Sequence, residues 1–450
     1  MYLSNPYIRI NKLEIRNYRG IDELRIDFPR PVMDLDTDIM VIGGRNGIGK
    51  TSVLECSAIL TLLSDEDEGE YFIDSHKITP QVNLSGLIIH SGADEAVISG
   101  EIEYSGEETK SKELIKTEIE IKIRRNNTIN LKKKSTDSEI RTEHKYPGYN
   151  TKDKDYIKKS TDSEIENDHK YPGYNTEDKD YKSKICETNT AGYSTKKITL
   201  IKDLSGKNEI KKEYYDLLNT ICGSEPNPLI GDKCLFFHSL RRVTHGNPQL
   251  KDAINYQTYG TESTGRPRIT DQNPKIKEHP VYPAGKKSEI SSFKSEILRT
   301  IIKQTDIFEY DSKSTAENGE YSLNILNSLL KTYAGAKSGK LRPAEDNSIE
   351  IRITPLNGGE PYSIDSLGSG EKDIISTLFM IHRNTSENPA IVLIDEPEMH
   401  QNPGWHRSFM NRIIELAPDN QYIITTNSEY IMDSVEEQNR IILTSGKDKQ

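Results

Sequence analysis

A glycine-rich segment near the start of the chain combines the residue types that bind phosphate groups. Residues 44–51 fit the pattern G-x-x-x-x-G-K-[ST], which ends in Lys50 and Thr51. Glycines let the backbone turn with positive φ, so that its N–H groups can face phosphate oxygens. The lysine supplies a charge for the β- and γ-phosphates of a nucleotide, and the threonine hydroxyl can complete a Mg²⁺ shell. The residues expected to contact ATP here are Gly44, Asn46, Gly47, Gly49, Lys50, Thr51 and Ser52.

A second set of reactive side chains follows an apolar run in the last quarter of the chain. Residues 391–394 (IVLI) are followed directly by Asp395 and Glu396. Four apolar residues in a row favour a buried parallel strand, whose carboxyl end would lie beside the phosphate loop. We expect Asp395 to hold Mg²⁺ through water and Glu396 to orient and deprotonate the attacking water. Residues 421–428 (QYIITTNS) predict another strand, whose polar end would bring Asn427 to the same site.

A third segment, residues 366–373 (SLGSGEKD), opens a predicted helix. Ser369 and Gly370 would stand at its N-terminus, where backbone N–H groups attract anions. One phosphate loop needs no second anion site within its own fold, so we expect these residues to contact the γ-phosphate held by a second copy. The alternative interpretation is an ordinary helix cap.

Regular elements must hold these residues in place. Residues 39–42 (IMVI) predict the strand that enters the phosphate loop, and apolar spacing over 51–63 predicts the helix that leaves it. Alternation at 12–16 and 23–28 predicts a hairpin with Arg19 at its tip, and alternation at 97–104 and 118–123 predicts further strands of an antiparallel lobe.

Composition limits the remaining possibilities. The chain has 450 residues, which favours two or three units, and its hydrophobic content of 33% suggests that part of it buries little apolar surface. A net charge of −11 argues against a protein that coats DNA, although a local basic groove stays possible. The four cysteines show no C-x-x-C spacing, so neither zinc nor a disulfide framework is indicated. No signal-peptide pattern and no apolar run long enough for a membrane span are present, which predicts a cytoplasmic protein without a membrane partner.

An internal duplication interrupts the pattern. Residues 133–156 return as 158–181 with four differences, and each copy is polar. Two units are too few for a solenoid. The interpretations left open are a mobile polar insertion and a contact arm that uses the paired tyrosines. The predicted organisation is a first half of an ATPase head (1–131), the repeat insertion (132–195), a helical insertion (196–340) and the second half of the head (341–450).

The order of these motifs carries a resemblance. The phosphate loop, L-G-S-G-E, I-D-E-P-E and the T-T-x-S strand resemble the ABC-type ATPases of the SMC, RecF and OLD group. The E-M-H-Q-N-P sequence and the segment 236–248 look most like bacterial anti-phage defence ATPases, such as those of Septu, retron and PARIS systems. The resemblance covers roughly 8–60 and 345–445 well. It implies an α/β fold, an ABC-type P-loop NTPase head with an antiparallel β lobe and a helical or irregular insertion.

The resemblance also implies a head-to-tail dimer that holds two ATP molecules with Mg²⁺ between the Lys50 face and the Ser369 face. The opening hairpin looks like the start of these proteins, which makes Arg19 a candidate nucleotide contact. The group usually places histidine where Asn427 stands, and asparagine cannot become charged, so we expect slow hydrolysis. A glutamine of the Q-loop is not assignable, and His238 or a neighbouring residue is the candidate for that region. No nuclease domain of the OLD type is expected, since only residues 445–450 follow the last predicted strand.

Four functions are compatible with these features. The first is a defence ATPase that senses a phage component and regulates a separately encoded effector nuclease. The second is a RecF-like or SMC-like repair ATPase that binds DNA. The third is the nucleotide-binding subunit of a transporter, which the long spacing between the phosphate loop and Ser369 disfavours. The fourth is a scaffold that binds nucleotide without hydrolysing it, which Asn427 keeps open.

Overall fold

The computed structural model describes residues 7–31, 37–78, 84–105, 114–124, 190–202, 208–223, 225–250, 291–304, 314–386, 388–399 and 401–444. They fall in the unit formed by Met1–Asn126 and Thr190–Gln450. The tandem repeats at 133–181, the polar stretch at 251–283 and His400 lie outside the described residues.

The central sheet has six strands in the order β18-β3-β17-β16-β10-β9. Its first five strands are parallel, and β9 pairs antiparallel with β10. Every residue of β10, β16 and β17 is buried, as a parallel sheet covered on both faces requires. The strands are β3 (Asp38–Gly44), β9 (Leu229–Ile230), β10 (Cys234–Phe237), β16 (Ile391–Asp395), β17 (Gln421–Thr425) and β18 (Arg440–Leu443).

Successive side chains of this sheet enter two different hydrophobic cores. Leu393 and Ile423 join a core that includes the buried face of α1 (Lys50–Leu63). Their neighbours Val392 and Ile424 join a second core, which contains apolar residues of α7 (Ser369–Thr385) and α8 (Pro403–Leu416). The strand period of two therefore explains why each of these strands is apolar on both faces.

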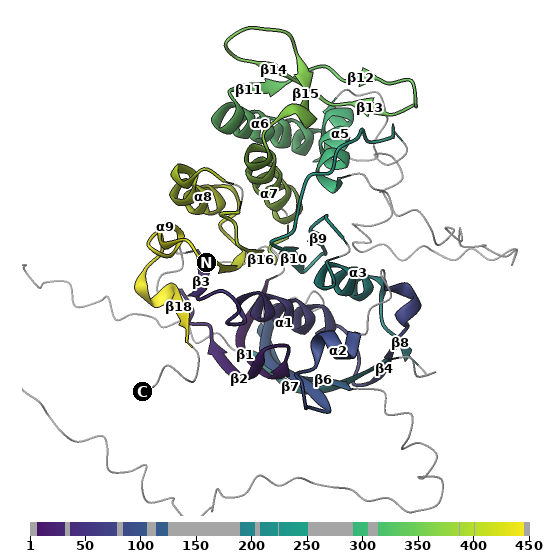
Figure 1. Cartoon of the computed structure of the whole chain (residues 1–450), viewed down its shortest axis with the longest axis vertical. Coiled ribbons are helices and arrows are strands. Elements are labelled where there is room, and N and C mark those ends of the chain that lie inside the picture. Colours follow the sequence, from purple (N-terminus) through teal and green to yellow (C-terminus); the bar gives the residue numbers. More distant parts are fainter. Residues whose placement is uncertain are drawn as a thin grey trace, which may run out of the picture. The chain divides into compact units, whose positions relative to one another are not determined.

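A second sheet of seven strands covers the other side of α1 (Figure 1), in the order β2-β1-β5-β6-β7-β4-β8. The pairs from β2 to β6 are antiparallel, as the alternating sequence predicts, but β7 joins β6 and β4 in parallel, and β8 joins β4 in parallel. The lobe is therefore mixed rather than wholly antiparallel. Its strands are β1 (Ile8–Tyr18), β2 (Ile21–Asp27), β4 (Gly69–Ile73), β5 (Glu95–Ser105), β6 (Leu114–Arg124), β7 (Thr190–Lys202) and β8 (Asn208–Glu209).

Gly100 of β5 lets α1 approach this sheet closely. A Cβ at that position would lie 2.6 Å from Cδ2 of Leu60 on α1 and 2.4 Å from the carbonyl oxygen of Lys12 on β1. The carbonyl of Lys12 belongs to the backbone, so a Cβ here would require a shift of β1 or β5, while the side chain of Leu60 would also have to move.

The remaining helices extend the second core. Helices α5 (Ser292–Gln304) and α6 (Ser314–Ala334) lie near α7, and a three-stranded sheet of β11 (Ala336–Ser338), β14 (Arg352–Pro355) and β15 (Tyr362–Ser363) adjoins α6 (Figure 1). The shorter elements are β12 (Arg342–Pro343), β13 (Ile349–Glu350), α2 (Leu84–Ile88), α3 (Lys212–Ile221) and α9 (Glu429–Met432). Helix α3 begins at Lys212, just after Asn208–Glu209, which pairs with β4. Within the described ranges, no helix has the length and apolar character that crossing a membrane would require.

Two buried side chains join the sheets at the end remote from the phosphate loop. The guanidinium of Arg9 on β1 is almost fully buried and pairs with Asp38 at the start of β3. The side-chain amide of Gln421 on β17 accepts from the backbone N–H of Ile10 at 2.8 Å and donates to its carbonyl at 2.9 Å. The first strand of the lobe is thus bonded directly to the central sheet.

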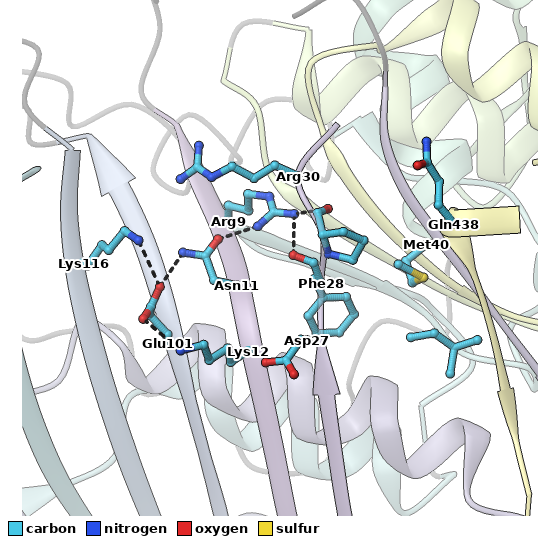
Figure 2. Close-up of a pocket in the computed structure, with 12 residues that line it drawn as sticks. Arg9, Asn11, Lys12, Asp27, Phe28, Arg30, Met40, Glu101, Lys116 and Gln438 are labelled. Atoms are coloured by element: carbon cyan, nitrogen blue, oxygen red, sulfur yellow. Dashed lines mark hydrogen bonds and ion pairs between the residues drawn. The ribbon is translucent and has the colours of Figure 1, made fainter. Parts of the chain in front are cut away.

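A pocket of about 580 Å³ opens beside this joint, and Figure 2 shows the charged groups that line it. Lys116 and Lys12 both lie within ion-pair distance of Glu101, and Asn11 donates to the same carboxylate. Burial raises the pKa of Glu101, but these three partners outweigh it, so the pKa is lowered overall. The charges of this pocket satisfy one another, and we assign no ligand to it.

Candidate functional site

The loop between β3 and α1 has the backbone that its glycines predict. Gly44, Gly47 and Gly49 have φ values of 149°, 79° and 106°, which residues other than glycine rarely adopt. A Cβ on Gly49 would also lie 2.8 Å from Cγ1 of Ile21 in the hairpin. Helix α1 has no side-chain cap and no acidic residue within its own first turn, which leaves its N-terminal N–H groups suited to bind an anion.

Lys50 folds back over this loop. Its ammonium, on a residue only 5% exposed, donates to the carbonyl oxygens of Gly44 at 2.9 Å and Arg45 at 3.2 Å. The third acceptor is the side-chain oxygen of Asn427 at 2.8 Å. Asn46 is exposed at the tip of the loop, whereas Ser52 is buried in the first turn of α1.

Thr51 and Asp395 lie together beneath the loop. The Thr51 hydroxyl donates to Oδ2 of Asp395 at 2.9 Å, and the hydroxyl of Thr425 donates to Oδ1 of the same carboxylate. Hydroxyl and carboxylate oxygens are the hard ligands that Mg²⁺ takes, and it is usually bound by one or two such groups together with substrate phosphates. The residues present therefore fit a magnesium ion that a nucleotide would complete.

Glu396 occupies a strained position at the end of β16. Its φ of 46° lies in the left-handed region, and its N–H donates to the carbonyl of Thr425 at 2.9 Å. Burial raises the pKa of Glu396, and the neighbouring carboxylates of Asp395 and Glu398 raise it further. A hydrogen bond from Asn427 and the charge of Lys50 act in the opposite direction. The overall rise is the property expected of a general base.

Asn427 connects Lys50 with Glu396. Its Nδ2 donates to Oε1 of Glu396 at 2.7 Å while its Oδ1 accepts from Lys50, and its backbone N–H donates to Glu398. An ammonium can only donate and a carboxylate accepts, so these two partners fix the orientation of the amide. Lys50, Thr51, Asp395, Glu396 and Asn427 thus form one cluster, as the sequence predicts.

Ser369 and Gly370 do not join this cluster. They begin α7, where Gly368 is the N-cap and its N–H donates to Oε2 of Glu371 at 2.8 Å. Gly368 and Ser369 are exposed. Among the described residues, no hydrogen bond links Ser369 or Gly370 to the phosphate loop or to Asp395.

The described side-chain contacts of Arg19 are to α1 and to the end of α3. Its guanidinium lies 3.0 Å from Oε1 of Glu55 on α1 and donates to the carbonyl of Ile221 at 3.1 Å. The hydroxyl of Tyr18 donates to the other oxygen of Glu55 at 3.1 Å. Burial raises the pKa of Glu55 to about 7, although Arg19 and Tyr18 lower it in part. A nucleotide contact by Arg19 stays a prediction, and the described contacts give it a role in holding α1.

Sequence reasoning missed Arg241 as a component of the site. This buried arginine follows β10 and donates to the backbone carbonyl of Asp395 at 2.7 Å. His238, which the sequence proposes for the Q-loop region, is buried at the end of β10, and its Nε2 has no hydrogen-bond partner among the described residues. Burial, with the nearby charge of Arg241, lowers the pKa of His238 to about 4. The signal that could have indicated Arg241 is a charged residue shortly after a fully apolar strand.

Comparison with known proteins agrees with this geometry. The AAA_15 family model, described as an AAA ATPase domain, matches residues 9–432. Two curated relatives are the Retron Ec83 probable ATPase of Escherichia coli and the Retron Vc95 probable ATPase of Vibrio cholerae serotype O1 biovar El Tor. The first is 27% identical over 160 residues, which cover 30% of this chain and 30% of that protein. The second is 32% identical over 103 residues, which cover 20% of each. The matched segments therefore span less than a third of either relative.

Two solved structures are also similar along most of their length. An Smc head bound to the C-winged helix domain of ScpA shares 12% identity and a TM-score of 0.39, with 95% of this chain and 92% of that chain covered. An Smc head with an extended coiled coil, bound to a ScpA domain from Pyrococcus furiosus, has the same identity and TM-score, with 96% and 92% covered.

The glycine conformations, the Thr51–Asp395 pair and the family match over residues 9–432 lead to one conclusion. The mixed α/β chain belongs to the AAA ATPase domain family and is related to the retron ATPases.

Proposed function

We propose that this chain binds ATP with Mg²⁺, hydrolyses it slowly, and closes with a second copy into a head-to-tail dimer around two nucleotides. The observation that carries the proposal is the Asn427 amide, which joins Lys50 to Glu396 at 2.8 Å and 2.7 Å. A phosphate-binding ammonium and a carboxylate with a raised pKa are thereby held at one place, where the γ-phosphate and its attacking water would meet.

Each residue has a defined task in this reaction. The N–H groups of the loop and the ammonium of Lys50 bind the phosphates, so Lys50 exchanges its present carbonyl acceptors for phosphate oxygens. Thr51 and Asp395 hold Mg²⁺, which supplies positive charge to the phosphates. Glu396 orients the water and accepts its proton. Asn427 can hydrogen-bond the γ-phosphate but stays neutral, which supports slow turnover.

The second copy supplies the other wall of the site. Ser369 and Gly370 are at the exposed or half-exposed start of a 17-residue helix, away from the phosphate loop of their own chain. Their N–H groups and hydroxyl suit a γ-phosphate that a partner presents. This position supports two composite sites per dimer.

We further propose that the ATPase serves a bacterial anti-phage defence system and regulates a separately encoded effector nuclease. The support is the relationship to two proteins named as retron ATPases, together with the motif order described above. ATP binding would then change the geometry of the dimer, and the effector would respond to that geometry.

Light scattering with and without Mg²⁺–ATP tests the core of this proposal, alongside a phosphate-release assay. The wild type should dimerise with ATP and release phosphate, and Lys50→Ala should do neither. Lys337→Ala is the matched control, since Lys337 is exposed on β11, and it should behave as wild type. ATP-dependent dimerisation by Lys50→Ala would overturn the proposal.

Two further results would favour a different function for the chain. Dimerisation without phosphate release would favour the nucleotide-gated scaffold, and stimulation of phosphate release by DNA would favour the repair ATPase. Co-purification of the chain with the products of neighbouring genes identifies the effector, and a stable complex that contains no nuclease would contradict the regulatory role.

A further inference from the structure

Arg241 lies between the ATP site and the helix that carries Ser369. It is 6% exposed, in the turn that follows β10. Its Nη1 donates to the carbonyl oxygen of Asp395 at 2.7 Å and to that of His238 at 3.0 Å. Its Nη2 donates to Oδ2 of Asp373 on α7 at 3.1 Å. One guanidinium therefore connects its own turn with the end of β16 and with α7.

The first contact fixes the peptide group that precedes the candidate base. The carbonyl of Asp395 belongs to the peptide bond whose nitrogen is that of Glu396. Arg241 holds the oxygen of this peptide, and the carbonyl of Thr425 accepts its N–H at 2.9 Å. Because Glu396 has a φ of 46°, it keeps this conformation only if its surroundings impose it. Arg241 is one of the groups that do so.

The other contact fixes the start of α7. Asp373 is four residues beyond Ser369, so it lies one turn further along the same side of the helix. Its carboxylate is 9% exposed and the side chain of Arg241 is 4% exposed, so the ion pair is shielded from water. A planar guanidinium bonded at two edges transmits a displacement between its partners, because its donors have a fixed geometry.

We propose that Arg241 is a positioning residue that couples the two ATP sites of the dimer. A partner's γ-phosphate on Ser369 would shift α7, and Arg241 would pass that shift to the peptide of Glu396 in the other site. The coupling rests on the proposed sandwich dimer. Beyond the dimer itself, the coupling means that each ATP site becomes fully active only when the other site is occupied.

The variants Arg241→Lys, Arg241→Gln and Asp373→Asn test this coupling. Lysine keeps the positive charge but loses the planar set of N–H donors, and glutamine keeps one donor group. Asparagine in place of Asp373 keeps an acceptor without charge. Arg242→Gln is the matched control, since Arg242 is the adjacent arginine and is exposed. The measurements are thermal unfolding, ATP affinity by calorimetry, kcat and KM for ATP, and the Hill coefficient of hydrolysis.

The expected result is a separation of binding from turnover. ATP affinity and KM should stay within about twofold, while kcat falls on the order of tenfold to a hundredfold, as for a misplaced catalytic group. The Hill coefficient should fall to that of independent sites in the Arg241 variants, with Asp373→Asn in the same direction. Combining Arg241→Gln with Asp373→Asn should add little to either single change, because both break one link.

The following results would overturn the proposed coupling. If Arg241→Gln does not fold, Arg241→Lys and Asp373→Asn can still test the coupling. The coupling would be refuted if the Hill coefficient and the kcat of both variants equal those of Arg242→Gln. A purely structural ion pair would lower the melting temperature and change KM and kcat together, without a selective loss of cooperativity. If the wild type itself hydrolyses ATP without dimerising, the proposed sandwich fails, and that result is visible before any Arg241 variant is made.

Discussion

The Nζ of Lys50 lies 2.8 Å from the Oδ1 of Asn427, although 377 positions separate the two residues in the chain. The same amide contacts Glu396 through its other end. The phosphate-binding cation and the candidate base are therefore connected through one neutral side chain, and a change to any of the three should affect the others.

Replacing Glu396 by glutamine should stop turnover while ATP binding persists. The amide oxygen of glutamine can still accept from Asn427, but the side chain cannot take a proton, so hydrolysis should fall on the order of 10²-fold or more. An ATP-bound dimer should accumulate in size-exclusion chromatography. Glu360→Gln, at an exposed position, is the control. Hydrolysis by Glu396→Gln at the control rate would show that Glu396 is not the base.

Removing the amide of Asn427 should shift the pH dependence of hydrolysis. A base must be deprotonated, so the rate should rise with pH through the raised pKa of Glu396. The Asn427 hydrogen bond favours the charged carboxylate and lowers that pKa. Asn427→Ala should therefore move the rising limb of the pH–rate profile to higher pH. A limb that stays in place, or one that persists in Glu396→Gln, would contradict this assignment.

An arginine at Ser369 should block the dimer without affecting the nucleotide site of the same chain. The bulky side chain would occupy the place of the partner's γ-phosphate, whereas Lys50 and Thr51 are left intact. Calorimetry should show ATP binding, and light scattering should show a monomer. Thr332→Arg, on the exposed side of α6, controls for added charge. Normal ATP-dependent dimerisation of Ser369→Arg would exclude contact in trans.

The buried carboxyl of Glu55 should make stability depend on pH. The pKa of Glu55 is raised from 4.5 to about 7 in the folded state. The stability that its neutral carboxyl contributes is therefore fully present below pH 4.5 and is lost as the pH rises through 7. The loss is on the order of 3 kcal/mol. Relative to Glu55→Gln, the free energy of unfolding of the wild type should thus decrease between about pH 5 and pH 8. Urea unfolding at several pH values measures it, and a constant difference would show that Glu55 titrates normally.

The elements around the ATP site could be predicted because their signals are local. Glycines at fixed spacing, Lys50 and Thr51, and an apolar run ending at Asp395 each specify backbone and burial over a few residues. The cluster then follows, since carboxyl ends of neighbouring parallel strands meet at one edge.

The contacts of Arg19 and Arg241 could not be predicted from these signals. Arg241 reaches Asp373 across 132 positions, and which helix lies beside a turn is decided by tertiary packing. The same limit applies to β7. Alternation at 118–123 shows which face of β6 is buried but not which strand lies beside it, so the parallel pairing of β6 with β7 could not be predicted.

Strand β3 has a consequence for how the protein is made. Its neighbours in the sheet are β17 and β18, which end at residues 425 and 443. During synthesis the phosphate loop is thus complete long before the strands that hold its leading edge have left the ribosome. Contacts of such sequence separation form slowly, and exposed apolar strands recruit chaperones in the interval. A nascent chain stopped before Gln421 carries every glycine of the loop and Lys50, but it lacks both strands that flank β3 in the sheet.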